Sequence, residues 1–230
     1  GPEAHNAIFA AQGRDIRFYG ESSTTYLVDE PSRHRLSRCL PGARIIIIMR
    51  EPVARTLSHH RWMTRLGFER RSLVRAIAEN GHGFDPAHHW DGNYKSYLQF
   101  SNYSRYIPKW AETFGADNVL LLRSEDLKRD QRAVLRRCLD FLGLPAIRVD
   151  GTVEKNRTEQ TIRAMPFALR PVERRLPGRL RASYPYRALR WRLLRAATPK
   201  PAERPTDEEE RALREALADD IAFYRALEPA

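Results

Sequence analysis

Short, wholly apolar runs alternate along the chain with longer segments in which apolar residues recur every three or four positions. Residues 44–49 hold four consecutive isoleucines and residues 118–123 a similar apolar run, and both predict buried strands. A third strand is predicted over residues 16–21. Four isoleucines in a row are typical of a strand covered on both faces, as at the centre of a parallel sheet. The alternation therefore predicts an α/β fold, with a central, mostly parallel sheet between helices.

Helical periodicity fills the stretches between these strands. Pro52 suits the first turn of a helix, and Gly143 suits the residue just beyond a helix end. Thr206 precedes a run of acidic residues, a pattern typical of a capped helix start. An aromatic stripe ending at Phe114 predicts one long helix. The predicted helices cover residues 31–40, 52–63, 72–78, 94–114, 134–142 and 206–227.

Charge divides the chain into parts. Its 230 residues include 40 Lys+Arg and 29 Asp+Glu, a net charge of +11, and residues 163–204 carry nearly all of that excess. A hydrophobic content of 42% argues against wholesale disorder, and no apolar stretch approaches the roughly 20 residues of a membrane span. We expect a core over residues 1–163, a basic Pro/Arg-rich segment over 164–205, and a C-terminal helix over 206–230 that docks on the core.

The basic segment interleaves aromatic residues with arginines between Arg179 and Arg195. This pattern suits contact with an anionic membrane surface or an acidic polysaccharide. The alternative is a helix whose apolar side packs on the core while its arginines face solvent. Nucleic acid is the least favoured partner, because five prolines between Pro166 and Pro199 interrupt any continuous helix that could enter a groove.

Polar side chains gather where two predicted strands end. Arg50 follows the isoleucine strand, and the next helix points its N-terminus at the same place, with Ser58 in its second turn. A guanidinium and free backbone N–H groups together favour a dianion such as phosphate. The alternative is an arginine that is solvated or ion-paired. The strand predicted over residues 16–21 leads into a second cluster, which contains Glu21 and several hydroxyl groups.

Four motifs in order resemble those of the sulfotransferases that use 3′-phosphoadenosine 5′-phosphosulfate (PAPS), in the style of bacterial and heparan-type members. The segment from Arg50 to Ser58 resembles the signature R-D/E-P-x-x-R-x-x-S. Upstream, the segment from Gly20 to Leu27 resembles G-E-x-S-P-x-Y-L. The other two lie downstream and are similar to Y-L-x-x-S/G-x-Y…W, from Tyr97 to Trp110, and to F-G-x-x-N-V-L…E-D-L…F-L-G-L, from Phe114 to Leu144.

The resemblance implies a P-loop-like three-layer α/β/α fold and a role for several residues. Arg50 and Ser58 match the pair that holds the 3′-phosphate of the nucleotide. Ser101 and Tyr103 match a helix alongside the nucleotide, although Tyr103 also belongs to the apolar stripe. Glu21 matches the loop that faces the acceptor, where it would be a catalytic base or position the acceptor; the alternative is a surface carboxylate paired with an arginine. Two more arginines match a basic loop over the nucleotide: Arg157 and Arg163.

The implied reaction moves a sulfuryl group from PAPS to a hydroxyl or amine of an acceptor and leaves adenosine 3′,5′-bisphosphate, with no metal. Carbohydrates, lipids and small metabolites all remain open as acceptors. We expect the acceptor to contact two variable segments, residues 67–92 and the residues after Gly151.

The chain departs from the family in its first residues. The sequence holds no G-x-x-K/R-x-G-T-T/S phosphate loop, which in the family follows the first strand and grips the 5′-phosphosulfate. We expect the chain to be a fragment of a longer protein rather than a degenerate relative. The alternative function is a non-catalytic relative that binds nucleotide or an anionic surface.

Cysteine and histidine usage adds two expectations. Cys39 and Cys138 are too few for a disulfide scaffold, and we interpret both as buried thiols of a cytoplasmic protein. A peripheral place on the inner face of the membrane is the alternative left open. His82, His88 and His89 fit no common zinc spacing, so we interpret them as solvated loop residues.

Overall fold

A computed structural model describes residues 19–66, 69, 71–79, 96–147 and 205–227, with isolated positions between 171 and 193. At its centre lie two parallel strands, β1 (Ile45–Met49) and β2 (Val119–Arg123). Ile45 pairs with Val119 and Met49 with Arg123, so both strands end at the same edge of the sheet. Both strands predicted from apolar runs are confirmed.

One face of this sheet packs on α6 (Tyr103–Phe114) and α13 (Ala218–Arg225). Met49 is buried there with Tyr103, Ile107 and Tyr224. Beyond β2 the chain forms α7 (Ser124–Arg129) and α8 (Gln131–Leu142), which contact that strand. A parallel sheet packed among helices is the predicted α/β fold.

The opposite face of β1 is not covered as the sequence predicted. Ile46 is 37% exposed and Ile48 is 52% exposed, whereas Leu122, opposite Ile48 on the neighbouring strand, is buried. Helices α7 and α8 contact β2, and their cover does not extend over Ile46 and Ile48. The prediction that both faces of the isoleucine strand are buried is therefore wrong for the described part of the chain.

Three further helices pack against elements of this core. Helix α2 (Glu30–Cys39) begins at Asp29, whose side chain accepts a hydrogen bond from the Ser32 N–H. Helix α3 (Pro52–Leu66) follows β1, and Pro52 is its first residue, as predicted. The short helix α4 (Leu73–Glu79) packs beside it, because Leu73 and Val53 share an apolar cluster.

The long helix predicted over residues 94–114 is shorter in the structure. The 3-10 turn η2 (Gln99–Ser101) precedes α6, and Asn102 lies between them with ψ of 64°. The interruption has a physical cause, because the Ser101 hydroxyl donates to the Pro52 carbonyl at 3.2 Å and holds η2 against α3. Two more 3-10 turns are η1 (Tyr26–Val28) and η3 (Ala116–Asn118).

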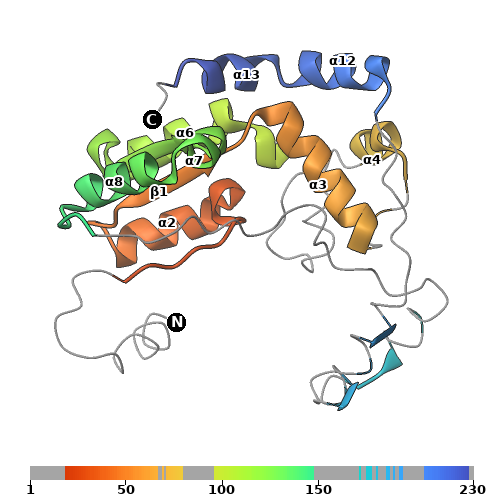
Figure 1. The fold of residues 1–230 in the computed structure, drawn as a ribbon, viewed down its shortest axis with the longest axis horizontal. Helices are drawn as coiled ribbons and strands as arrows, with labels where there is room; N and C mark the ends of the chain where they lie inside the picture. The colour runs from red at the N-terminus through yellow and green to blue at the C-terminus, as the bar shows by residue number, and fades with distance from the viewer. Residues whose placement is uncertain are drawn as a thin grey trace.

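The C-terminal region forms two helices, α12 (Asp207–Ala216) and α13, which lie end to end along one side of the molecule (Figure 1). Thr206 and Glu209 form a capping box at the start of α12, which confirms the predicted cap. Leu213, Leu217 and Ile221 pack with Val53 of α3. The predicted apolar stripe is therefore the surface that docks this region on the core.

The structure also bears on the predicted burial of the cysteines, on the strand predicted over residues 16–21 and on membrane spans. Cys39 is exposed, so the prediction that both thiols are buried is wrong for Cys39, and Cys138 is partly buried. The strand predicted over residues 16–21 is not present at residues 19–21, and residues 16–18 lie outside the described part. In the described residues, no helix is both long and apolar enough to span a bilayer. Most of the basic segment, and His82, His88 and His89, also lie outside the described residues.

Candidate functional site

The parallel register places the residues that follow β1 and β2 side by side. Arg50 and Glu51 leave β1 one step beyond Met49, and Glu125 follows β2 two residues beyond Arg123, the partner of Met49. The carboxyl edge of a parallel sheet is where such folds bind ligands, because the loops after neighbouring strands meet there. We call the backbone of Arg50 and Glu51 the strand-end turn.

The two residues predicted to hold a phosphate have free polar ends. Among the described residues, neither the Arg50 guanidinium nor the Ser58 hydroxyl has a hydrogen-bond or ion-pair partner, and both residues are partly buried. Ser58 lies about 9 Å along the axis of α3 from Pro52, on the 1.5 Å rise of an α-helix. A guanidinium and a hydroxyl without protein partners fit an anionic ligand.

The backbone at the start of α3 offers an anion fewer free N–H groups than the sequence predicted. Pro52 has no N–H group, and the Ala54 N–H donates to the Glu51 carboxylate at 2.7 Å. The prediction of a set of free N–H groups is therefore wrong at Ala54, because Glu51 caps the helix with its own side chain. Binding of an anion would depend mainly on the arginine side chains.

Arg55, the second arginine of the motif, is bound inside the protein. Its guanidinium donates to the Tyr97 carbonyl at 2.9 Å and to His59 Nδ1 at 3.2 Å, and lies 5.0 Å from the centre of the Phe100 ring. Burial lowers the pKa of Arg55 to about 10, which still leaves it charged at neutral pH. No carboxylate pairs with it within the described residues. Arg55 therefore adds positive charge behind the site while tying α3 to the residues before α6.

Ser101 is fully buried, and its hydroxyl is already engaged. It lies 2.8 Å from the Thr56 hydroxyl, donates to the Pro52 carbonyl, and lies 3.4 Å from the Arg55 guanidinium. These bonds fasten η2 to α3. These contacts give Ser101 a structural role. Direct contact between Ser101 and a nucleotide stays a prediction.

Tyr103 is a core residue whose hydroxyl contacts the strand-end turn, and its place alongside the nucleotide stays a prediction. Its ring is buried in the cluster with Met49, Ile107 and Tyr224, while its hydroxyl accepts a hydrogen bond from the Arg50 N–H at 3.4 Å. Burial raises the pKa of Tyr103, so the hydroxyl is neutral at physiological pH. The residue thus belongs to the core and also contacts the backbone of the strand-end turn.

The structure says less about the other three predicted site residues, Glu21, Arg157 and Arg163. Glu21 is exposed, and its charge adds to burial in raising the pKa of the nearby Tyr26 hydroxyl. That neighbour is a tyrosine rather than the arginine considered from the sequence. A catalytic role for Glu21 stays a prediction. Arg157 and Arg163 lie outside the described residues.

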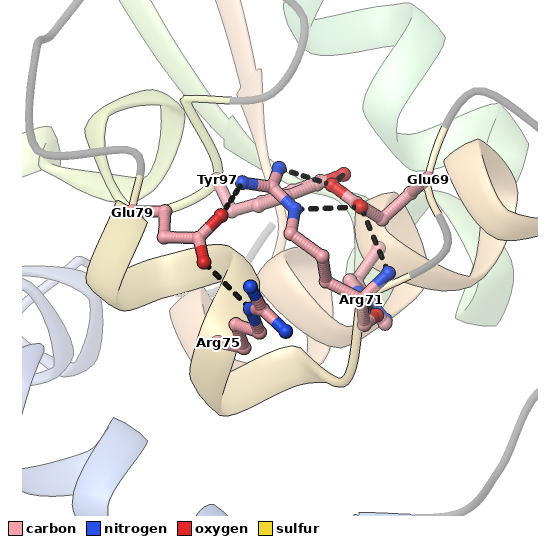
Figure 2. A network of polar contacts seen from close by, with 6 residues as sticks. Glu69, Arg71, Arg75, Glu79 and Tyr97 are labelled. Carbon is pink, nitrogen blue, oxygen red and sulfur yellow. Dashed lines mark hydrogen bonds and ion pairs between the residues drawn. The ribbon is translucent and has the colours of Figure 1, made fainter.

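A second polar network links residues 69–79, which belong to the segment expected to contact the acceptor, to Tyr97 (Figure 2). The Glu69 side chain is 2% exposed; it pairs with Arg71 at 2.6 Å and accepts from the Tyr97 hydroxyl at 2.9 Å. Arg71 also pairs with Glu79 at 2.8 Å, and Arg75 holds the other oxygen of that carboxylate at 2.6 Å. Burial and the nearby Glu69 charge raise the pKa of Tyr97, so its hydroxyl remains a donor.

Replacing Tyr97 with Phe should lower the free energy of unfolding by about 2 kcal/mol, because a hydrogen bond to a buried charged group is lost. Urea denaturation measures this change. The control is Arg75→Ala, which removes one partner of an ion pair in which the Arg75 side chain is 72% exposed and should cost less than about 1 kcal/mol. Equal effects of the two variants would contradict the central place of Tyr97 in this network.

Sequence reasoning missed three residues around the strand ends: Glu125, Asp220 and Tyr224. The Tyr224 hydroxyl donates to Glu125, and the Asp220 carboxylate accepts from the N–H and hydroxyl of Ser104 at 2.9 and 2.7 Å. No local pattern marks these pairs, since their partners lie about a hundred residues apart. The one available signal is that Asp220 and Tyr224 are four residues apart and so share a helix face with the apolar stripe.

Fold and site together define a parallel α/β protein with a candidate anion site at the carboxyl edge of its sheet. Residues 33–166, more than half of the chain, match the Sulfotransferase domain family. The chain belongs to this family, which confirms the resemblance found in its motifs.

Individual relatives agree with this membership. The chain is 25% identical over 139 residues to heparan sulfate glucosamine 3-O-sulfotransferase 3B1 of Mus musculus, and 26% identical over 140 residues to heparan sulfate glucosamine 3-O-sulfotransferase 6 of Homo sapiens. These alignments cover 60% of this chain but only 34% and 39% of the relatives, so the chain matches little more than a third of their length.

A solved structure is similar over nearly the whole chain. The sulfotransferase from Alicyclobacillus acidocaldarius superposes with a TM-score of 0.63 at 19% identity, and the match covers 97% of this chain and 69% of that one. At this identity the comparison supports the fold, which is that of a sulfotransferase.

Proposed function

We propose that this chain takes part in PAPS-dependent sulfuryl transfer to a hydroxyl or amine of a glycan. The observation that carries the proposal concerns Arg50 and Ser58 beside the carboxyl edge of the sheet, whose polar ends have no partner among the residues that the structure describes. Membership of the sulfotransferase family supports the reaction class. The names of the curated relatives support a glycan acceptor, because they describe sulfation of heparan sulfate glucosamine.

In this proposal Arg50 and Ser58 hold the 3′-phosphate of the nucleotide. Arg50 supplies a planar fork of N–H donors that matches phosphate oxygens, and the Ser58 hydroxyl supplies one more donor. The charge on Arg55 behind them strengthens the local positive potential. These groups bind and orient the donor, which is how positioning contributes to group transfer.

The transfer itself forms a bond between sulfur and the acceptor oxygen or nitrogen while the bond from sulfur to the phosphate oxygen breaks. The acceptor proton passes to a base, and adenosine 3′,5′-bisphosphate leaves. Glu21 remains the proposed base, because an exposed carboxylate is open to an acceptor. Arg157 and Arg163 remain proposed contacts to the nucleotide.

The basic residues between Arg179 and Arg195 fit the same proposal. Heparan-type glycans are polyanions, and clustered arginines raise the local concentration of such a partner. Contact with an anionic membrane surface also remains a proposal, which vesicle binding at low and high salt would test. The cytoplasmic location remains a proposal as well.

Calorimetric titration of the 230-residue chain with adenosine 3′,5′-bisphosphate tests the nucleotide site. We expect micromolar binding, weaker binding of adenosine 5′-monophosphate because it lacks the 3′-phosphate, and about a tenfold loss of affinity in Ser58→Ala, or about 1.4 kcal/mol. Thr64→Ala is the matched control on the same helix. Equal affinities for both nucleotides would contradict a 3′-phosphate site, and so would an unchanged affinity in Ser58→Ala.

A further inference from the structure

Helix α13 contacts the neighbours of the strand-end turn through two side chains, although it lies about 170 residues further along the chain. The Tyr224 hydroxyl donates to the Glu125 carboxylate, and the Arg123 guanidinium lies 4.9 Å from the centre of the Tyr224 ring. One turn earlier, Asp220 binds the N-terminus of α6 through Ser104. The same helix thus contacts the end of β2 and the start of α6.

Glu125 links Tyr224 to the strand-end turn. Its carboxylate accepts a hydrogen bond from the Ser124 hydroxyl at 3.1 Å, and the backbone N–H of Glu51 lies near enough to lower its pKa. Burial alone would raise the pKa of Glu125, but the bonds from Tyr224 and these neighbours lower it, so the carboxylate stays ionised at neutral pH. The negative charge of Glu125 is therefore stabilised by fixed hydrogen-bond donors, beside a site that would bind an anion.

The other half of the turn is held from α6. The Arg50 N–H donates to the Tyr103 hydroxyl, and Tyr103 begins the helix whose N-terminus Asp220 caps. The Arg50 N–H therefore ends on a side chain whose position depends on α13, and the Glu51 N–H lies near the Glu125 carboxylate to which Tyr224 donates. The direction of the Arg50 side chain follows from the backbone of this turn.

We propose that Tyr224 and Glu125 are positioning residues that hold the Arg50–Glu51 backbone so that the Arg50 guanidinium is preorganised for the nucleotide phosphate. The inference rests on the proposed function for its ligand but on the hydrogen bonds alone for its structural part. It makes the C-terminal helix a part of the nucleotide site rather than only a cover for the core. Preorganisation raises affinity because less conformational freedom is lost on binding.

The test combines amide hydrogen exchange at Arg50 and Glu51 with titration of adenosine 3′,5′-bisphosphate, both on the full chain. Tyr224→Phe removes one hydroxyl and keeps the ring. We expect it to speed exchange at both amides by about tenfold and to weaken nucleotide binding by about threefold to tenfold. Glu125→Gln, which keeps the shape of the side chain, should act in the same direction.

Tyr106→Phe is the matched control, because Tyr106 is also buried and its hydroxyl accepts from Gln99 at 2.7 Å, away from the strand-end turn. Faster exchange in Tyr224→Phe but not in Tyr106→Phe would support the proposal. Unchanged exchange in Tyr224→Phe, or an equal increase in both variants, would overturn it. If the unmodified chain binds no nucleotide, the proposed function fails, while the exchange rates still decide whether α13 holds the turn.

Discussion

Replacing Asp220 with Ala should lower the free energy of unfolding by about 3 kcal/mol, the largest stability effect we expect from a single polar side chain. The Asp220 carboxylate is 3% exposed and accepts from the Ser104 N–H and hydroxyl and from Asn102 Nδ2 at 3.0 Å. Its loss leaves buried donors without a partner and removes a negative charge from the N-terminus of α6. Urea denaturation measures the change.

Two variants sharpen this prediction. Asp219→Ala removes the neighbouring acid, which is exposed on the same first turn of α13, and should change stability by less than about 0.5 kcal/mol. Asp220→Asn keeps acceptor oxygen but no charge, so it should cost less than Asp220→Ala. If Asp220→Ala and Asp219→Ala were equally mild, α13 would not be fastened to α6 through this carboxylate.

Arg50→Ala should weaken binding of adenosine 3′,5′-bisphosphate by about a hundredfold, or about 2.7 kcal/mol, while leaving the stability of the free protein nearly unchanged. The reason is that the Arg50 guanidinium has no protein partner in the described part of the chain, so its removal breaks no internal contact. Its planar fork is the main cation offered to a phosphate at this edge. Calorimetry gives the affinity, and thermal denaturation gives the stability.

Arg50→Lys separates charge from geometry. A lysine keeps the positive charge but loses the fork, so affinity should fall by less than in Arg50→Ala yet stay below that of the unmodified chain. Raising the salt concentration should reduce the difference between Arg50→Lys and Arg50→Ala, since salt screens the charge that they do not share. Loss of folding in Arg50→Ala would show instead that the residue is structural.

Much of the central fold could be predicted because it depends on local patterns. A run of isoleucines has few alternatives to a strand, and Pro52, three residues after its end, fixes where α3 begins. The motif residues Arg50 and Ser58 belong to these same elements, so their places followed from the sequence. Gly143 was equally predictable, because the end of α8 places it at a positive φ of 64°.

Contacts between distant segments account for what the sequence did not predict. The helix before Phe114 breaks at Ser101 because a hydroxyl there bonds to Pro52, which no helical periodicity reveals. Ile46 and Ile48 are apolar yet exposed, since burial depends on which elements reach them. Asp220 and Tyr224 read as ordinary positions of an amphipathic helix, and only the three-dimensional arrangement brings them to the strand ends.

The most direct test of the central claim is a crystal structure of the chain bound to adenosine 3′,5′-bisphosphate. The account predicts that the 3′-phosphate lies within hydrogen-bonding distance of the Arg50 guanidinium and the Ser58 hydroxyl, at the carboxyl edge of β1. A nucleotide whose 3′-phosphate contacts neither residue would contradict it.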